Sequence, residues 1–245
     1  MGYVAPPVLP DTPDLSLAPA PADPMRAFQP SAGREQWWTG DPASLPYHEA
    51  GVFHRHIISR KAVLSPAQCR VLIDCFERRC GELAPEDPDP FWSGRFIWQN
   101  ALPPEEVDAA RIMQQVRFLS LTLLNQAVRM PRALYGDTAQ IVRWPPGTQL
   151  SPHADNIHPD GQPNTTPHRS FSSILYLNDD YEGGETYFPG HGVRLKPEAG
   201  ALVLFGAGPE YVHGVSNVTR GMRYTYAGWF TFDKAWEAVD AAAVY

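Results

Sequence analysis

Two short stretches of the sequence, "HAD" at 153–155 and "HPD" at 158–160, each place an aspartate two residues after a histidine. Successive side chains of a strand point to opposite faces, so an extended "HAD" presents an imidazole and a carboxylate to one face. Pro159 and Gly161 predict a turn for the second stretch, where the side chains need not converge. The first pair is therefore the better candidate for a metal site.

A catalytic iron needs a third protein ligand, and His213 is the best candidate for it. His213 follows the apolar run "GALVLFG" and begins another strand-like segment. Together with His153 and Asp155 it would supply two imidazoles and one carboxylate, a set that leaves open positions on iron(II) for substrate and oxygen. Zinc binds the same ligand atoms, so the ligand types alone leave the metal open.

Arg223 stands ten residues after His213 in a run of alternating residues. This alternation places Thr225, Ala227 and Trp229 on the face of Arg223, and the aromatic residues between them on the other face. The fork of a guanidinium matches a carboxylate bidentately, so the pattern predicts a carboxylate clamp. The alternative is an exposed arginine on an edge strand.

The elements that must position these residues form two helices followed by a β-rich body. Ser65 and Pro66 supply an N-cap and a first helical residue, and apolar residues recur at helical spacing after them. A second helix is predicted from Glu105 to about Met130, with prolines at both ends. After Leu134, short apolar runs alternate with Gly, Pro and Asn turns, which predicts a β-sandwich or barrel.

The 245 residues have ordinary hydrophobic content, at 43%, and a net charge of −7 without a basic run. This composition is typical of a globular enzyme and argues against nucleic acid or a membrane as a partner. Proline is frequent, at 26 residues, and residues 1–35 are especially rich in it, so they are predicted to be a flexible arm, and 36–245 a single domain with its β-core at about 134–232.

The three cysteines, Cys69, Cys75 and Cys80, lie in the first predicted helix without CxxC spacing. They are predicted to be small buried residues rather than ligands or disulfides. An odd number of cysteines and an N-terminus unlike a signal peptide predict a cytoplasmic location.

Taken together, these residues resemble the prolyl 4-hydroxylase-like branch of the iron(II)/2-oxoglutarate-dependent dioxygenases. That family has H-x-D, a distant H, and a Lys or Arg about ten residues later. The stretch "RSFSSILYLNDDYEGGETYFP" is similar to its Arg, Tyr-Leu-Asn and Gly-Gly-x-Thr segments, and "VRLKPEAGALVLF" to the strand before its distal histidine. The resemblance is close over 134–232 and loose before it. It implies a double-stranded β-helix (jelly-roll, cupin-like) core preceded by α-helices.

The resemblance also implies roles for four residues. His153, Asp155 and His213 would hold Fe(2+), and Arg223 would bind the distal carboxylate of 2-oxoglutarate. Related halogenases lack the carboxylate ligand, so Asp155 favours oxygen insertion. The co-substrates implied are 2-oxoglutarate and O2, with L-ascorbate as a candidate accessory reductant.

Three further positions are expected to surround the co-substrate. Ser172 stands where the family often has a Thr near 2-oxoglutarate. Trp144 occupies the place of a frequent Tyr, a departure that questions the usual hydroxyl contact to the co-substrate. Trp229 is expected to pack near Arg223.

The implied reaction converts 2-oxoglutarate to succinate and CO2 and hydroxylates an unactivated C–H bond. The substrate is a small metabolite, an amino acid or a prolyl-type side chain of a peptide. Asn156, His168 and Arg169, in the polar loop after the ligand strand, are the predicted substrate contacts. The aromatic cluster Trp92, Phe96 and Trp98 is expected at the pocket mouth, with core packing as its alternative.

Two readings outside this class remain open at the level of sequence. The chain would then be a non-catalytic metal-binding β-barrel or sensor, or a zinc hydrolase that uses the same ligands. Neither accounts for Arg223. The exact substrate, the oligomeric state, and the choice between hydroxylation, desaturation and ring formation are also open.

Overall fold

The computed structural model describes residues 37–49, 57–86, 90–128, 130 and 132–238. The predicted arm at 1–35 lies outside this range. Whether 36–245 is one domain stays a prediction, as does the cytoplasmic location.

Two α-helices precede the β-rich body, as predicted. Helix α1 spans Pro66–Leu83, and the Ser65 side chain accepts a hydrogen bond from the Gln68 backbone while the Gln68 side chain accepts one from the Ser65 backbone. This capping box satisfies donors that the first helical turn leaves open. A short 3-10 helix, η4 (Pro104–Glu106), leads into α2 (Val107–Ala127), which ends slightly before the predicted Met130.

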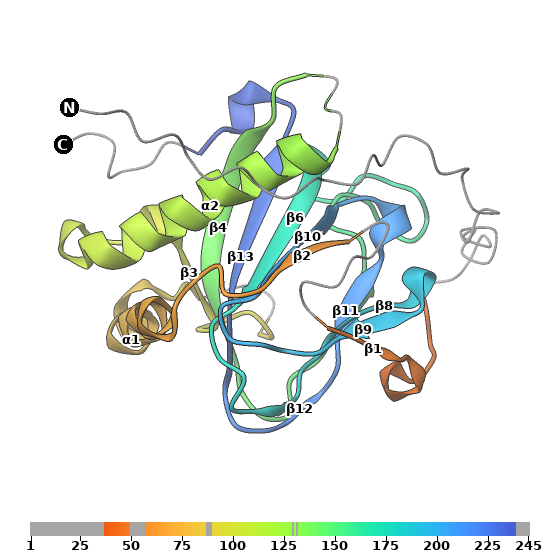
Figure 1. Cartoon of the computed structure of the whole chain (residues 1–245), viewed down its shortest axis with the longest axis horizontal. Helices are drawn as coiled ribbons and strands as arrows, with labels where there is room; N and C mark the ends of the chain where they lie inside the picture. Colours follow the sequence, from red (N-terminus) through yellow and green to blue (C-terminus); the bar gives the residue numbers. More distant parts are fainter. Residues whose placement is uncertain (1–36, 50–56, 87–89, 129, 131, 239–245) are drawn as a thin grey trace, which may run out of the picture.

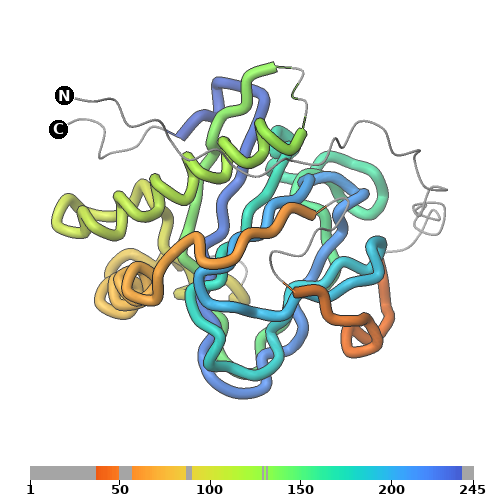
Figure 2. The backbone as a smooth tube through the Cα atoms, in the orientation of Figure 1, coloured from red at the N-terminus to blue at the C-terminus, as the bar shows by residue number. Residues whose placement is uncertain are grey.

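Most strands form two sheets. The major sheet has the order β2-β10-β6-β13-β4-β3, the minor sheet the order β1-β9-β8-β11-β5, and β12 pairs with β7. The strands are β1 (Tyr47–His48), β2 (Ile58–Arg60), β3 (Phe96–Trp98), β4 (Tyr135–Trp144), β5 (Leu150–His153), β6 (Arg169–Tyr176), β7 (Glu182–Gly183), β8 (Thr186–Phe188), β9 (Val193–Leu195), β10 (Leu202–Gly206), β11 (His213–Val215), β12 (Val218–Arg220) and β13 (Arg223–Thr231). The tube in Figure 2 shows how segments distant in sequence, such as β4 and β13, run side by side.

The two helices cover one face of the major sheet, and the minor sheet faces its other side (Figure 1). The largest apolar cluster lies between helices and sheet, where Phe76 and Met113 meet Ile141, Tyr226 and Phe230. These aromatic residues of β13 are the ones that the alternation places away from Arg223. The opposite face of β13 therefore points between the sheets, where the candidate site lies.

Two irregularities break the alternation at one end of the major sheet. Between Gly228 and Phe230 of β13, the partner strand β4 advances from Ala139 to Gly136, so β4 carries an extra residue. Between Phe230 and Thr231, the partner strand β6 likewise gains a residue. Bulges of this kind re-aim neighbouring side chains.

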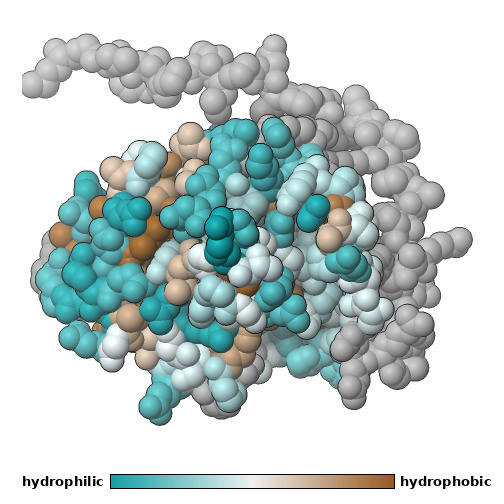
Figure 3. All heavy atoms as spheres, turned by 90° about the horizontal axis from the view of Figure 1, so that it is seen from below, coloured by the Kyte–Doolittle hydropathy of each residue, from teal (hydrophilic) through white to brown (hydrophobic). Residues whose placement is uncertain are grey.

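The surface and the cysteines agree with the composition. Figure 3 shows a face on which hydrophilic residues predominate and apolar residues form small groups. None of the helices among the described residues is long and apolar enough to cross a membrane.

All three cysteines are free; Cys69 and Cys75 are buried, and burial raises the pKa of Cys69 to about 11 and that of Cys75 to about 12. The prediction of buried helix residues is confirmed for Cys69 and Cys75, whereas Cys80 is half-buried.

Candidate metal centre and substrate cavity

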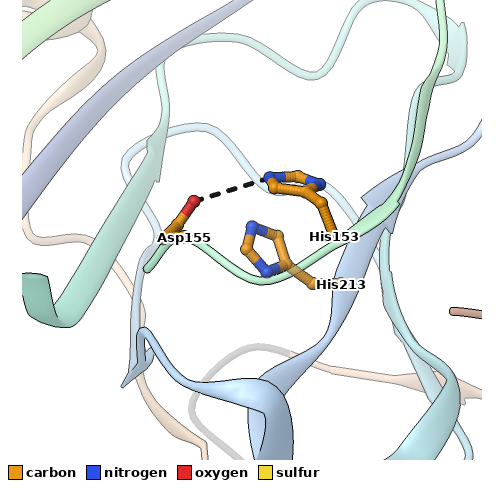
Figure 4. Close-up of side chains that lie close together, drawn as sticks. All are labelled: His153, Asp155 and His213. Carbon is orange, nitrogen blue, oxygen red and sulfur yellow. Dashed lines mark ion pairs between the residues drawn. The ribbon is translucent and has the colours of Figure 1, made fainter. Parts of the chain in front are cut away.

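His153, Asp155 and His213 come together between the sheets (Figure 4), with one ligand atom from each within 4.8 Å of the others. His153 ends β5 and His213 begins β11, and these two residues are direct partners in the antiparallel pairing of the strands. The strand ends before Asp155, whose backbone N–H donates to the Ala207 carbonyl at 2.9 Å. Asp155 therefore reaches the site from the turn after β5 rather than from an extended "HAD" segment, although the convergence is as predicted.

The histidine rings are oriented by backbone carbonyls. The Nδ1 of His153 lies 3.0 Å from the Ser151 oxygen, and the Nδ1 of His213 lies 3.1 Å from the Tyr211 oxygen. A carbonyl only accepts, so each Nδ1 carries a proton and each Nε2 is the atom left for a metal. The Ser172 hydroxyl donates to Asp155 Oδ2 at 2.5 Å. Outer hydrogen bonds of this kind fix metal ligands before the ion binds.

The charges of the three groups suit a divalent cation. Burial opposes ionisation of Asp155, but the two imidazoles and the Ser172 hydroxyl hold the pKa of its carboxyl well below the ordinary value. Burial and the neighbouring His153 lower the pKa of His213 to about 4. A metal requires an ionised carboxylate and neutral imidazoles, and Asp155 and His213 supply these forms. Burial opposes the charged form of His153, but its Nε2 lies 3.5 Å from Asp155 Oδ1 and this contact raises the pKa of His153, so a metal at Nε2 would displace a proton.

Arg223 begins β13 and is 1% exposed, which excludes the edge-strand alternative. Its Nη2 donates to the Thr186 hydroxyl at 3.4 Å, whereas its Nε and Nη1 have no hydrogen-bond partner. Among the described residues, no carboxylate forms an ion pair with it. A buried charge is costly unless it is paired, so this guanidinium fits an anionic ligand such as a carboxylate.

Aromatic and hydroxyl groups surround that guanidinium. Its Cζ lies 4.9 Å from the ring centroid of Trp144 and 5.6 Å from that of Tyr176. The Trp144 indole donates to the Thr225 hydroxyl at 3.2 Å. Trp144 therefore lies beside the predicted clamp, as expected. Sequence reasoning assigned no role to Tyr176 and Thr186, although both stand in stretches that resemble the family.

One expectation about the co-substrate pocket needs correction. Trp229 does not pack near Arg223, because it lies near the other end of β13. There the Arg169 guanidinium lies 3.7 Å from the Trp229 ring centroid, and the Trp98 ring centroid lies 6.3 Å from it. Six residues of strand separate the two positions, about 20 Å of backbone. Ser172 lines the same cavity as Arg223, and its hydroxyl donates to the ligand candidate Asp155; that it also lies against 2-oxoglutarate stays a prediction.

One cavity of about 420 Å³ joins these groups. Its lining includes the three metal-ligand candidates, Arg223 and five aromatic rings, those of Trp92, Phe96, Trp98, Trp144 and Trp229. Trp92, Phe96 and Trp98 line the cavity and also pack in one apolar cluster with Trp144, so both alternatives hold in part, and a place at the pocket mouth stays a prediction. The volume is within the usual range for small-molecule sites, and apolar walls with few polar groups are typical of them.

The predicted substrate loop is only partly at the cavity. Arg169 lines it, whereas Asn156 and His168 do not. The Asn156 side chain donates to the Arg169 carbonyl at 2.9 Å, and His168 lies against Asp137 with 3.1 Å between Nε2 and Oδ2. The turn predicted at 158–160 is present, with the His158 N–H bonded to the Gln162 carbonyl at 2.8 Å.

Two imidazoles and one carboxylate inside a β-sandwich, with a buried unpaired arginine in the same cavity, are the groups that a 2-His-1-carboxylate iron(II) site with an anionic co-substrate needs. Residues 139–231 match the model of the 2OG-Fe(II) oxygenase superfamily. The predicted resemblance is confirmed. The description of the superfamily names iron(II) and 2-oxoglutarate, in agreement with the predicted cofactor and co-substrate.

Curated relatives share part of the chain. Prolyl 3-hydroxylase 2 of Rattus norvegicus is 37% identical over 100 residues, which are 36% of this chain and 14% of the relative. Prolyl 3-hydroxylase 3 of Homo sapiens is 40% identical over 92 residues, 33% of this chain and 12% of the relative. The chain thus spans only a small part of the length of the relatives it matches.

Solved structures share the fold over most of the chain. A Pseudomonas putida prolyl-4-hydroxylase is 25% identical, with a TM-score of 0.56 over 73% of this chain and 94% of that one. A viral collagen prolyl hydroxylase from Paramecium Bursaria Chlorella virus-1, in complex with 2OG, is 20% identical, with a TM-score of 0.56 over 73% and 97%. These similarities support the predicted double-stranded β-helix preceded by helices.

Proposed function

We propose that this protein is an iron(II)- and 2-oxoglutarate-dependent dioxygenase that hydroxylates a prolyl residue of a peptide. The observation that carries the proposal is the pairing, in one cavity, of the three convergent ligand atoms with the buried Arg223. A zinc hydrolase or a metal sensor has use for the three ligands but none for a buried guanidinium without an anion.

His153, Asp155 and His213 would hold the iron through Nε2, a carboxylate oxygen and Nε2. Three protein ligands leave the remaining positions open for the keto acid and oxygen. When bound, iron and 2-oxoglutarate would supply the oxidising chemistry: one atom of O2 is inserted into the C–H bond to give an alcohol, and the other enters succinate as 2-oxoglutarate is oxidised to succinate and CO2.

The residues of this chain bind 2-oxoglutarate and orient the groups around it. Arg223 forms two charge-assisted hydrogen bonds with the distal carboxylate, which fixes the direction of 2-oxoglutarate in the cavity. Ser172 holds the Asp155 oxygen that it contacts, and thereby the plane of that carboxylate. The indole of Trp144 and the ring of Tyr176 exclude water from the guanidinium and strengthen its attraction for an anion.

A peptidyl proline is the substrate class that the cavity favours. Proline-rich segments dock on aromatic-lined grooves, and the rings of Trp92, Phe96, Trp98 and Trp229 form such a surface. Arg169, which lies on Trp229 and lines the cavity, offers guanidinium donors for peptide carbonyls. The names of the curated and structural relatives, prolyl 3-hydroxylase and prolyl-4-hydroxylase, support the same substrate class.

The test is succinate release from 2-oxoglutarate with added iron(II), oxygen and ascorbate, with and without poly-L-proline. The wild type should release succinate and add oxygen to the polymer, and Asp155→Ala and His213→Ala should each reduce both to background. Amino-acid analysis of the product separates 3-hydroxyproline from 4-hydroxyproline, a choice on which the relatives differ.

The sequence supplies a matched control. The look-alike pair His158 and Asp160 sits in a turn outside the cavity, so the double variant His158→Ala/Asp160→Ala should keep wild-type turnover. Full activity in either ligand variant would refute the iron assignment. Hydrolysis dependent on zinc, without succinate release, would favour the hydrolase.

A further inference from the structure

Four side chains form a continuous row from the surface to the cavity. The Trp236 indole is stacked on the His168 imidazole, with centroids 3.8 Å apart and planes within 3°. His168 Nε2 lies 3.1 Å from Asp137 Oδ2, and the same oxygen lies 3.3 Å from Arg169 Nε. The guanidinium of Arg169 then lies on the Trp229 ring inside the cavity.

The inner members of this row are held by buried charge. The side chains of His168 and Asp137 are each 9% exposed, and that of Arg169 is 12% exposed. In such a setting a guanidinium must remain close to a carboxylate. Asp137 supplies that partner; the other carboxylate whose charge acts on Arg169 is the metal-ligand candidate Asp155. Asp137 thus determines where the guanidinium points.

The outer member of the row belongs to a short segment that follows β13. Trp236 ends the 3-10 helix η7 (Lys234–Trp236), whose N-cap Asp233 accepts a hydrogen bond from the Ala235 N–H at 3.0 Å. Two residues later, the Ala238 N–H donates to the Gly136 carbonyl at 2.9 Å. The segment therefore touches β4 beside Asp137 by its backbone and covers His168 by its indole.

The irregularities in the major sheet bring the row together. Strict alternation would place Asp137 with Ala139 and Ile141, on the face that the helices cover. The extra residue of β4 turns the Asp137 side chain toward Arg169 instead. The extra residue of β6 falls next to Arg169 itself.

We propose that Trp236 is a positioning residue for substrate binding. Its ring immobilises His168, and His168 and Asp137 together hold the Arg169 guanidinium in the orientation that receives the peptide. This rests on the proposed function, because Arg169 is taken as the peptide contact. The segment after β13 therefore controls affinity for the peptide without altering the binding of 2-oxoglutarate at Arg223.

The kinetic test compares Trp236→Ala with the wild type, with poly-L-proline as the probe. Loss of a stacked ring predicts a rise of about 3- to 10-fold in KM for the polymer. The kcat and the KM for 2-oxoglutarate should stay within about twofold, since Arg223 lies at the other end of β13. Trp236→Phe keeps a ring on His168 and should restore most of the affinity. Phe118→Ala, at an aromatic residue of α2 that is 72% exposed, is the matched control and should change nothing.

A second readout needs no substrate. In protein labelled with 15N-arginine and loaded with Zn(II), Arg169→Lys assigns the Nε–H signal of Arg169 by its disappearance, and Arg223→Lys assigns that of Arg223. Trp236→Ala should broaden the Arg169 signal or accelerate its exchange and leave the Arg223 signal in place. Thermal unfolding identifies a variant that fails to fold, in which case Trp236→Phe and His168→Gln replace it in the same measurement.

The outcomes separate this inference from the proposed function. If the wild type leaves poly-L-proline unmodified while Trp236→Ala changes the Arg169 signal, the substrate class is wrong and the positioning role stands. If the Arg169 signal and the KM for the polymer both stay at wild-type values in Trp236→Ala, the positioning role is refuted. A rise in the KM for 2-oxoglutarate of the same size would also refute it.

Discussion

Arg169 and Arg223 line the same cavity, and each lies over an indole, yet only one of the two guanidinium groups has a carboxylate partner. The guanidinium of Arg169 is 3.7 Å from the Trp229 ring and pairs with Asp137. The guanidinium of Arg223 is 4.9 Å from the Trp144 ring and has no ion pair within the described part of the chain. One arginine is neutralised by the fold, and the other retains a full uncompensated charge.

This difference separates two kinds of binding. An arginine with an internal carboxylate is neutral as a pair, so it directs hydrogen bonds at an uncharged ligand such as a peptide carbonyl. An arginine without one attracts an anion, and the nearby rings strengthen that attraction by excluding water. The cavity thus has an anion end and a neutral, aromatic end, with the metal-ligand candidates between the two sheets.

Replacing the unpaired arginine should have the largest effect. Arg223→Gln leaves the distal carboxylate of 2-oxoglutarate without its charged partner, a loss of about 4 kcal/mol or roughly 1,000-fold in KM. The measurement is succinate release against 2-oxoglutarate concentration. Without ligand, the same variant should have a higher Tm than the wild type, because an uncompensated buried charge has been removed.

Arg223→Lys is the control for charge. It should bind 2-oxoglutarate better than Arg223→Gln and less well than the wild type, since a lysine offers no bidentate fork. A wild-type KM for 2-oxoglutarate in Arg223→Gln would contradict the anion site.

Breaking the internal pair should destabilise the protein instead. Asp137→Asn removes the carboxylate from a guanidinium whose side chain is 12% exposed, and the free energy of unfolding should fall by about 3 kcal/mol. Urea unfolding measures it. The double variant Asp137→Asn/Arg169→Gln removes both charges and should recover most of the loss, which identifies the pair rather than the single residue as the source. If the free energy of unfolding fell equally in the single and the double variant, Asp137 would stabilise the fold by contacts other than its pair with Arg169.

The anion end could be predicted from the sequence because it follows regular strands. Alternation from Arg223 correctly places Thr225, Ala227 and Trp229 in the cavity, and the pairing of β5 with β11 brings His153 against His213. The start of α1 could also be predicted, because Ser65 as the N-cap and Pro66 as the first helical residue define a helix start from adjacent residues alone.

The neutral end could not be predicted in the same way. Strict alternation of side chains along β4 would place Asp137 on the face that the helices cover. The bulges that turn it to the other face arise from pairing between strands distant in sequence, and no residue near Asp137 indicates them. His168 and Arg169 were both predicted to be substrate contacts in a loop, because nothing near them in sequence indicates Asp137 or Trp236. A carboxylate inside an apolar strand was the one available hint.

The smallest effects should come from the two indoles, and they test whether the ends act independently. Trp144→Phe weakens the ring under Arg223 and should raise the KM for 2-oxoglutarate about 2- to 5-fold, with the KM for poly-L-proline unchanged. Trp229→Phe should do the reverse, because its ring lies under Arg169. Steady-state kinetics with each substrate varied in turn gives both values. If either variant changed the two KM values together, the arginines would share one binding event, and the division of the cavity into two ends would be wrong.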